Sequence, residues 1–91
     1  MKYTIVPTAQ FKRDRKKAVK RGLDIPLLKW VIDELAEGRK LPPKHKDHKM
    51  TGDRHGYRDC HITPDWVLIY RYEENELILS LVEMNSHSNL F

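Results

Sequence analysis

Three consecutive segments near the end of the chain have the composition of β-strands, and this succession constrains the fold more than any other feature. They cover residues 57–62, 66–72 and 77–84. Only Thr63-Pro64-Asp65 and Glu73-Glu74-Asn75-Glu76 separate them, and connections this short join antiparallel neighbours. The sequence therefore predicts an antiparallel meander of three strands.

One further strand and two helices are predicted ahead of the meander. Residues 3–6 are rich in β-formers and stop at Pro7. Thr8 is suited to cap a helix over about 9–21, and Asp24 a second helix that ends at Gly38. The expected class is α+β, with order β-α-α-β-β-β and a two-helix hairpin packed on a small antiparallel sheet.

The length and composition exclude several classes of protein. The chain of 91 residues is expected to form one domain, residues 1–91. No apolar run approaches the ~20 residues of a membrane helix, and the first residues contain too short an apolar stretch for a signal peptide. With Cys60 as the single cysteine, no internal disulfide can form, which fits a reducing cytoplasm. We therefore expect a cytoplasmic protein that does not bind membranes.

The charges are arranged in blocks. Residues 1–21 carry eight Lys or Arg and one Asp, and residues 39–58 carry seven Lys or Arg and two Asp. Such a block can be a solvated face, but two of them on one small domain favour a polyanionic partner. The partner classes are nucleic acid and an acidic protein segment.

Titratable side chains gather in the second half of the chain. Strand alternation puts Asp59 and His61 on one face, and the turn brings Asp65 near His61. His48 lies in the loop before this strand, and His87 follows the last strand. We expect His48, His61, Asp65 and His87 to meet in one shallow site.

Histidines beside carboxylates and cations suit metal-free cleavage of RNA. One group takes the proton from the ribose 2′-OH, another protonates the departing 5′-oxygen, and a cation stabilises the phosphorane. Imidazole serves both proton transfers because its ordinary pKa is near neutrality.

Other interpretations of these residues remain open. A zinc site from His45, His48, His55 and either Cys60 or His61 has no standard spacing. A cysteine inside a strand is more often an inert core residue than a nucleophile. Trp66, Tyr70 and Tyr72 share a strand face that is more often core, although Trp66 could stack on a base.

An ordered set of motifs over essentially the whole chain resembles the YafQ branch of the RelE/ParE toxin superfamily. Phe11-Lys12-Arg13-Asp14 and Lys20-Arg21-Gly22 are similar to its basic first helix. The later motifs are Lys46-Asp47-His48, Gly52, Gly56-Tyr57-Arg58-Asp59-Cys60-His61-Ile62, Pro64-Asp65-Trp66, Leu68-Ile69-Tyr70 and Ser86-His87-Ser88-Asn89-Leu90-Phe91.

This resemblance implies a toxin of a type II toxin-antitoxin system that cuts mRNA on the ribosome and is neutralised by a DinJ-like antitoxin. It implies 2′-OH attack, without a metal or other cofactor. By motif match, the catalytic residues are His48, His61, Asp65 and His87. His87 is the expected general acid, and His48 or His61 with Asp65 the base side. Asp59, Trp66 and Phe91 match supporting positions.

The chain departs from this branch at one position that bears on activity. The branch often has Arg-Thr-Gly where this chain has Glu83-Met84-Asn85. If that arginine stabilises the phosphate, a substitute cation is required, and the candidates are Lys46, Lys49, Arg54 and Arg58. The alternative function is therefore a catalytically weak or inactive domain that binds the ribosome or an antitoxin without cutting RNA.

Overall fold

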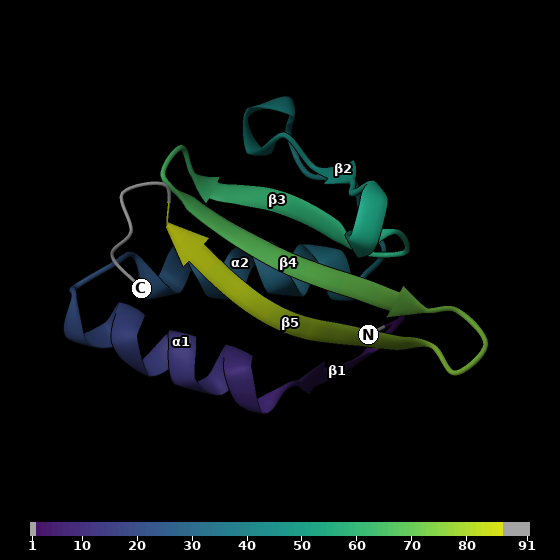
Figure 1. Ribbon diagram of the computed structural model, residues 1–91, viewed down its shortest axis with the longest axis horizontal. Coiled ribbons are helices and arrows are strands. Elements are labelled where there is room, and N and C mark those ends of the chain that lie inside the picture. The colour runs from purple at the N-terminus through teal and green to yellow at the C-terminus, as the bar shows by residue number, and fades with distance from the viewer. Residues whose placement is uncertain (1, 87–91) are drawn as a thin grey trace.

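The computed structural model describes residues 2–86, in which two helices pack on a five-stranded sheet (Figure 1). The elements are β1 (Thr4–Pro7), α1 (Ala9–Lys20), α2 (Ile25–Ala36), β2 (His48–Lys49), β3 (Arg58–Thr63), β4 (Trp66–Glu73) and β5 (Ile78–Ser86). Short 3-10 turns at Pro43–His45 and Gly52–Arg54 flank β2. The predicted α+β class is confirmed.

Both helices begin at the residues that the sequence indicates. The Thr8 hydroxyl accepts a hydrogen bond from the Phe11 N–H at 3.1 Å, and the Asp24 carboxylate accepts one from the Leu27 N–H at 3.0 Å. These side chains satisfy N–H groups that the first helical turn leaves unpaired. Gly38 follows α2 with φ of +75°, a conformation that disfavours any residue with a Cβ.

The sheet is mixed rather than antiparallel, with strand order β1-β5-β4-β3-β2. The predicted meander is present as β3, β4 and β5, but β1 pairs with β5 in parallel. The antiparallel prediction was therefore wrong at one edge, because local sequence does not reveal which distant strand becomes a partner. The short β2, in a stretch predicted to be a loop, adds the other edge.

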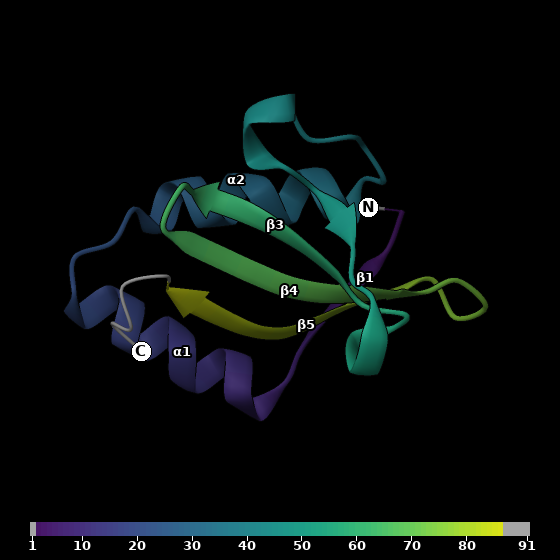
Figure 2. The same cartoon turned by 45° about the horizontal axis from the view of Figure 1, so that its top comes forward.

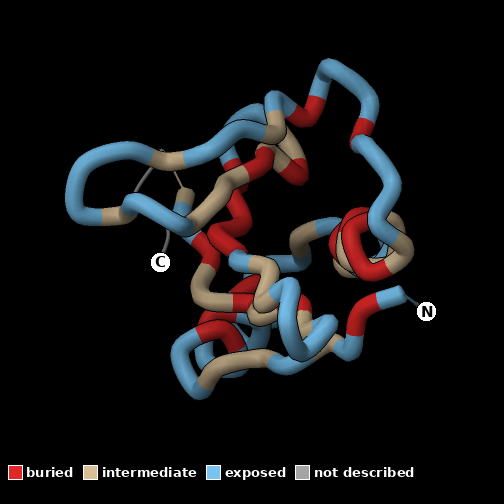
Figure 3. The backbone as a smooth tube through the Cα atoms, turned by 90° about the vertical axis from the view of Figure 1, so that its right-hand side faces the viewer, coloured by how far each residue is buried: buried red, intermediate tan, exposed pale blue. Residues whose placement is uncertain are grey.

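The two faces of the sheet have different surroundings. Helix α2 lies behind β3 and β4, and α1 lies along β5, so both cover the same face (Figures 1 and 2). Trp66, Leu68 and Tyr70 belong to the core on this inner face. Figure 3 shows that buried residues are concentrated in the strands and helices and that the connections consist mostly of exposed residues. The opposite, outer face carries no helix.

A buried carboxylate attaches α1 to the last part of β5. The Asp14 side chain accepts a hydrogen bond from the Met84 N–H at 3.0 Å and one from the Gln10 amide at 2.8 Å. The Thr8 hydroxyl donates to the Val82 carbonyl at 2.6 Å, beside an irregularity in the β4–β5 pairing. These contacts replace the sheet hydrogen bonds that β1 no longer supplies beyond Pro7.

Across residues 2–86, no helix has both the length and the apolar character required to span a membrane.

Candidate active site

His48 and Asp59 contact each other on the outer face of the sheet, and they form an ion pair when His48 is protonated. Strand β2 pairs antiparallel with β3, and this register places His48 directly opposite Asp59. The two side chains meet with 3.2 Å between Nε2 and Oδ1. Only 14% of the Asp59 side chain is exposed, so the carboxylate is held in place. The pairing of β2 with β3 thus brings these two side chains together.

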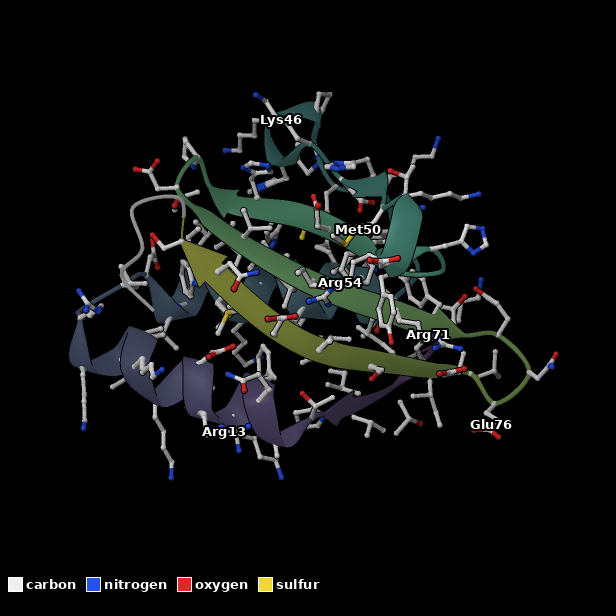
Figure 4. All side chains as sticks on the ribbon, in the orientation of Figure 1. Arg13, Lys46, Met50, Arg54, Arg71 and Glu76 are labelled. Carbon is white, nitrogen blue, oxygen red and sulfur yellow. The ribbon has the colours of Figure 1, made fainter. Side chains whose placement is uncertain are left out.

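The other ring nitrogen of His48 is also occupied. Its Nδ1 lies 2.7 Å from the carbonyl oxygen of Lys46, which has a left-handed backbone with φ of 46°. A carbonyl and a carboxylate are both acceptors, so a ring protonated at both nitrogens matches both neighbours. The Asp59 Oδ1 atom has no hydrogen-bond partner among the described residues, so its contact with His48 is electrostatic only. When protonated, His48 is placed to stabilise negative charge. Lys46 itself is exposed beside it (Figure 4).

His61 lies two residues beyond Asp59 on the same face of β3. His48 and His61 are therefore diagonal neighbours across the β2–β3 pair, a relation that separates residues by ~7–8 Å. The Nδ1 atom of His61 lies 3.3 Å from the Pro64 carbonyl. Because a carbonyl can only accept, this contact requires the proton on Nδ1. In the neutral form of such a ring, Nε2 is the basic nitrogen.

Asp65 is exposed in the two-residue turn between β3 and β4. The turn places it at the same end of the hairpin as His61. The register of β3 with β4 shifts between His61 and Thr63, which alters the local course of the strand beside the turn. His87 and Phe91 lie outside the described residues.

Arg54 pairs with the anion that distinguishes this chain from the YafQ pattern. Its guanidinium lies 2.6 Å from the Glu83 carboxylate, although the two residues come from the Gly52–Arg54 turn and from β5. Glu83 is opposite Ile69, and Ile69 is opposite Asp59. The outer face therefore carries a row from His48 through Asp59 to Glu83, with Arg54 over its far end.

Two of the cations predicted to substitute for the family arginine lie elsewhere. Arg58 has its side chain on the inner face, where it donates to the Tyr70 hydroxyl at 3.2 Å and to Asp47 at 3.3 Å. Lys49 is opposite Arg58 in the register and so shares its face rather than that of His48. Alternation along a strand is the reason, since it sends neighbouring residues to opposite faces.

Three side chains on the inner face hydrogen-bond to one another: Asp47, Arg58 and Tyr70. The Tyr70 hydroxyl donates to the Asp47 carboxylate, and the ring is fully buried. Burial and this bond raise the pKa of Tyr70 well above its ordinary value. Burial opposes the charge of Arg58, but its bonds to Tyr70 and Asp47 raise its pKa overall. This part of the Lys46-Asp47-His48 motif is structural.

Trp66 and Cys60 belong to the core. Trp66 is 2% exposed and packs with the inner face, so the structure supports the core interpretation over base stacking. Cys60 is also buried, and burial first, then the nearby Asp47 and Asp59 charges, raises the pKa of its thiol. A protonated, inaccessible thiol is a poor nucleophile.

His45 has a position that sequence reasoning did not find. It is buried, and its Nδ1 lies 2.6 Å from the carbonyl oxygen of His61. This contact attaches the Pro43–His45 turn to β3, while the ring lies 5.9 Å from that of Trp30. Among the described residues, no three His, Cys, Asp or Glu side chains come close enough to hold a metal ion.

The chain is similar to known proteins over most of its length. The family model described as "Bacterial toxin of type II toxin-antitoxin system, YafQ" matches residues 3–91. The mRNA interferase toxin YafQ of Escherichia coli strain K12 is 36% identical over 85 residues, which cover 92% of this chain and 90% of that protein.

Solved structures show the same fold. The crystal structure of a metal-bound toxin from Helicobacter pylori has a TM-score of 0.89 and 42% identity, and covers 98% of this chain and 99% of that one. YafQ in the E. coli DinJ-YafQ complex has a TM-score of 0.85 and 36% identity, with 98% of each chain covered. The chain therefore belongs to the YafQ family of toxins from type II toxin-antitoxin systems.

Proposed function

We propose that this YafQ-family toxin is a ribosome-associated endoribonuclease that cleaves mRNA through attack of the ribose 2′-OH. The interferase name of the E. coli relative supports the activity. The observation that carries the mechanism is the His48–Asp59 pair beside His61 on the helix-free face. The products would be a 2′,3′-cyclic phosphate and a free 5′-OH.

The contacts of the two histidines suggest different roles. In this proposal His61, whose Nδ1 faces the Pro64 carbonyl, takes the 2′-OH proton through Nε2, with Asp65 as the carboxylate of the same hairpin. His48, placed between the Lys46 carbonyl and Asp59, acts in its protonated form and stabilises the charge that develops on phosphate. His87 is the proposed general acid on its motif match alone. Each well-placed acid or base contributes about 10²–10⁴ in rate.

Arg54 is the proposed substitute for the family arginine. Glu83 occupies the strand position of that arginine, and the loop supplies a guanidinium directly against it. The Arg54 side chain is 43% exposed, and a guanidinium has five N–H donors, so donors remain for a phosphate. In this proposal Glu83 orients the Arg54 guanidinium, so the site keeps a cation although the family arginine is absent.

The partners follow from charge and shape. Helix α1 carries six Lys or Arg residues and its C-cap Arg21 adds a seventh, which suits the phosphates of ribosomal RNA. A groove of about 600 Å³ between α1 and α2 has apolar walls and a rim that includes Lys12, Arg15 and Lys29. This surface fits an acidic, amphipathic segment of a DinJ-like antitoxin, and salt should weaken both interactions.

Induction of the toxin without an antitoxin tests the function. We expect growth arrest and new mRNA 5′ ends by primer extension, both lost in His61→Ala and retained in His55→Ala. His55 is an exposed histidine of the neighbouring turn and serves as the matched control. Growth arrest without new 5′ ends would instead support the alternative of a binder that does not cut, which Glu83 in place of arginine favours.

Metal independence is tested on the purified toxin with translating ribosomes. Cleavage by this mechanism should persist when transition metals are removed by a chelator that leaves the ribosomal Mg²⁺ in place. Loss of cleavage, restored by a transition metal, would contradict it.

A further inference from the structure

An aromatic ring with two arginines extends the outer face beyond the candidate active site. Tyr57 directly precedes β3, and the alternation of the strand, continued by one residue, places it on the face that carries Asp59 and His61. Its ring centroid lies 5.9 Å from the guanidinium carbon of Arg54 and 5.6 Å from that of Arg71. Arg54 and Arg71 come from the Gly52–Arg54 turn and from β4, and lie near each other over the sheet (Figure 4).

Register explains why these three residues meet. Asp59 is opposite Ile69, and Arg58 is opposite Tyr70, so the residues that follow in the same antiparallel register are Tyr57 and Arg71. Tyr57 lies ~7 Å along the strand from Asp59, and His61 lies the same distance on the other side. The cluster is therefore within reach of a nucleotide adjacent to one held at the histidines.

The two guanidiniums retain the capacity to bind a ligand. Arg54 pairs with Glu83, and Arg71 pairs with Glu73 at 3.2 Å, yet their side chains are 43% and 45% exposed. The inner Arg58 differs, because it is 28% exposed and directs donors to both Tyr70 and Asp47.

We propose that Tyr57, Arg54 and Arg71 form a subsite for a nucleotide that flanks the scissile linkage in single-stranded RNA. Arg71 contacts its phosphate, and its base stacks on the exposed surface of the tyrosine and guanidinium groups. Proteins bind single-stranded nucleic acid through this combination of cations and aromatic rings. The assignment rests on the proposed function, since it uses the same RNA and the same face.

Binding of a fluorescein-labelled single-stranded RNA oligonucleotide tests the subsite, measured by anisotropy in a His61→Ala background that prevents cleavage. Tyr57→Leu should weaken binding by roughly 5- to 100-fold through lost stacking, and Tyr57→Phe should preserve it. Arg71→Ala should weaken binding and reduce the salt slope by ~0.7, the value for one phosphate contact with a single strand.

Arg39→Ala is the matched control, because Arg39 is also an exposed arginine paired with an acid, Glu34, but lies just beyond α2. Equal affinities for the Arg71→Ala and Arg39→Ala proteins, or no saturable RNA binding in the background protein, would overturn the subsite. Primer extension with the His61-containing toxin reports separately on cleavage. A toxin that cuts no mRNA but shows the expected loss with Tyr57→Leu would refute the endoribonuclease and retain the subsite.

Discussion

Each face of the sheet holds an aspartate, an arginine and a tyrosine, but only the three on the inner face are hydrogen-bonded to one another. On the inner face, Tyr70 donates to Asp47, and Arg58 donates to both. On the outer face, the corresponding residue types are Asp59, Arg54 and Tyr57. There the aspartate faces His48, and the arginine lies between the tyrosine ring and Glu83.

The difference shows that residue type does not distinguish a structural cluster from a functional one. The inner tyrosine is fully buried and its neighbours satisfy one another, so removal of any member leaves an unpaired polar group in the protein. The outer cations remain nearly half exposed, so a phosphate can compete for them. Substitutions on the two faces should therefore separate stability from activity.

The largest expected effect is on the outer face. Asp59→Ala should lower the cleavage rate by about 10²–10⁴-fold, because His48 loses the carboxylate that faces its ring. The midpoint of urea unfolding should change little, since the buried Oδ1 atom of Asp59 has no hydrogen-bond partner to lose among the described residues. Rates of mRNA cleavage and circular dichroism measure the two quantities. A large drop in stability would show that both faces are structural.

The next largest effect is expected for Arg54→Ala, which should lower the cleavage rate by about 10²–10³-fold if the guanidinium stabilises the phosphorane. Arg54→Lys should restore part of the rate. The unchanged rate of an Arg54→Ala toxin would remove Arg54 from the mechanism and leave Glu83 without a compensating cation.

Asp47→Ala should affect stability rather than catalysis. It leaves the Tyr70 hydroxyl and Arg58 without their acceptor, at a cost of about 1–3 kcal/mol in the free energy of unfolding. Chemical denaturation measures this loss, and the cleavage rate per folded molecule should be retained. A reduced rate in fully folded protein would extend the active site to the inner face.

Alkaline pH should reduce the contribution of the same inner group to the stability of the fold. The pKa of Tyr70 is raised in the fold, whereas an unfolded tyrosine titrates near its ordinary value of 10.0. The contribution of Tyr70 to stability is thus complete below about pH 10, and it declines above that pH because only the unfolded chain loses the proton. Urea unfolding from pH 8 to 11 should show the decline, and Tyr70→Phe should make it shallower.

The smallest effect is expected at Cys60. Its buried thiol, with a raised pKa, should not react with a thiol reagent at pH 8 in the native protein and should react after unfolding. Spectroscopic titration with such a reagent measures this. Rapid labelling of the folded toxin would contradict the closed inner face.

Much of the fold could be predicted because its signals are local. Thr8 and Asp24 cap the helices, and the short turns around Pro64 and Glu74 make neighbours of the last three strands. The parallel partner of β1 was not predictable, because a strand pattern contains no record of a partner more than seventy residues away. The two-residue β2 was missed since it is shorter than any periodic signal.

The candidate site likewise contains residues that the sequence indicated and residues that it did not. Motif resemblance identified His48, Asp59 and His61, and alternation placed the last two on one face. Arg58 was included with them as a candidate phosphate ligand, although the same alternation sends it inward. The buried His45 and the Tyr57–Arg71 contact carried no pattern that would have indicated them.

Local patterns and the order of motifs were enough to assign the toxin family, the helix limits, the strand meander and the residue types available for acid–base chemistry. Those properties depend on side chains within a few positions of one another, or on a pattern of motifs. Three contacts became known only from the folded chain: Arg54 pairs with Glu83, Asp47 accepts a hydrogen bond from Tyr70, and His48 faces Asp59. These contacts join distant segments, and they depend on which strands pair and in what register.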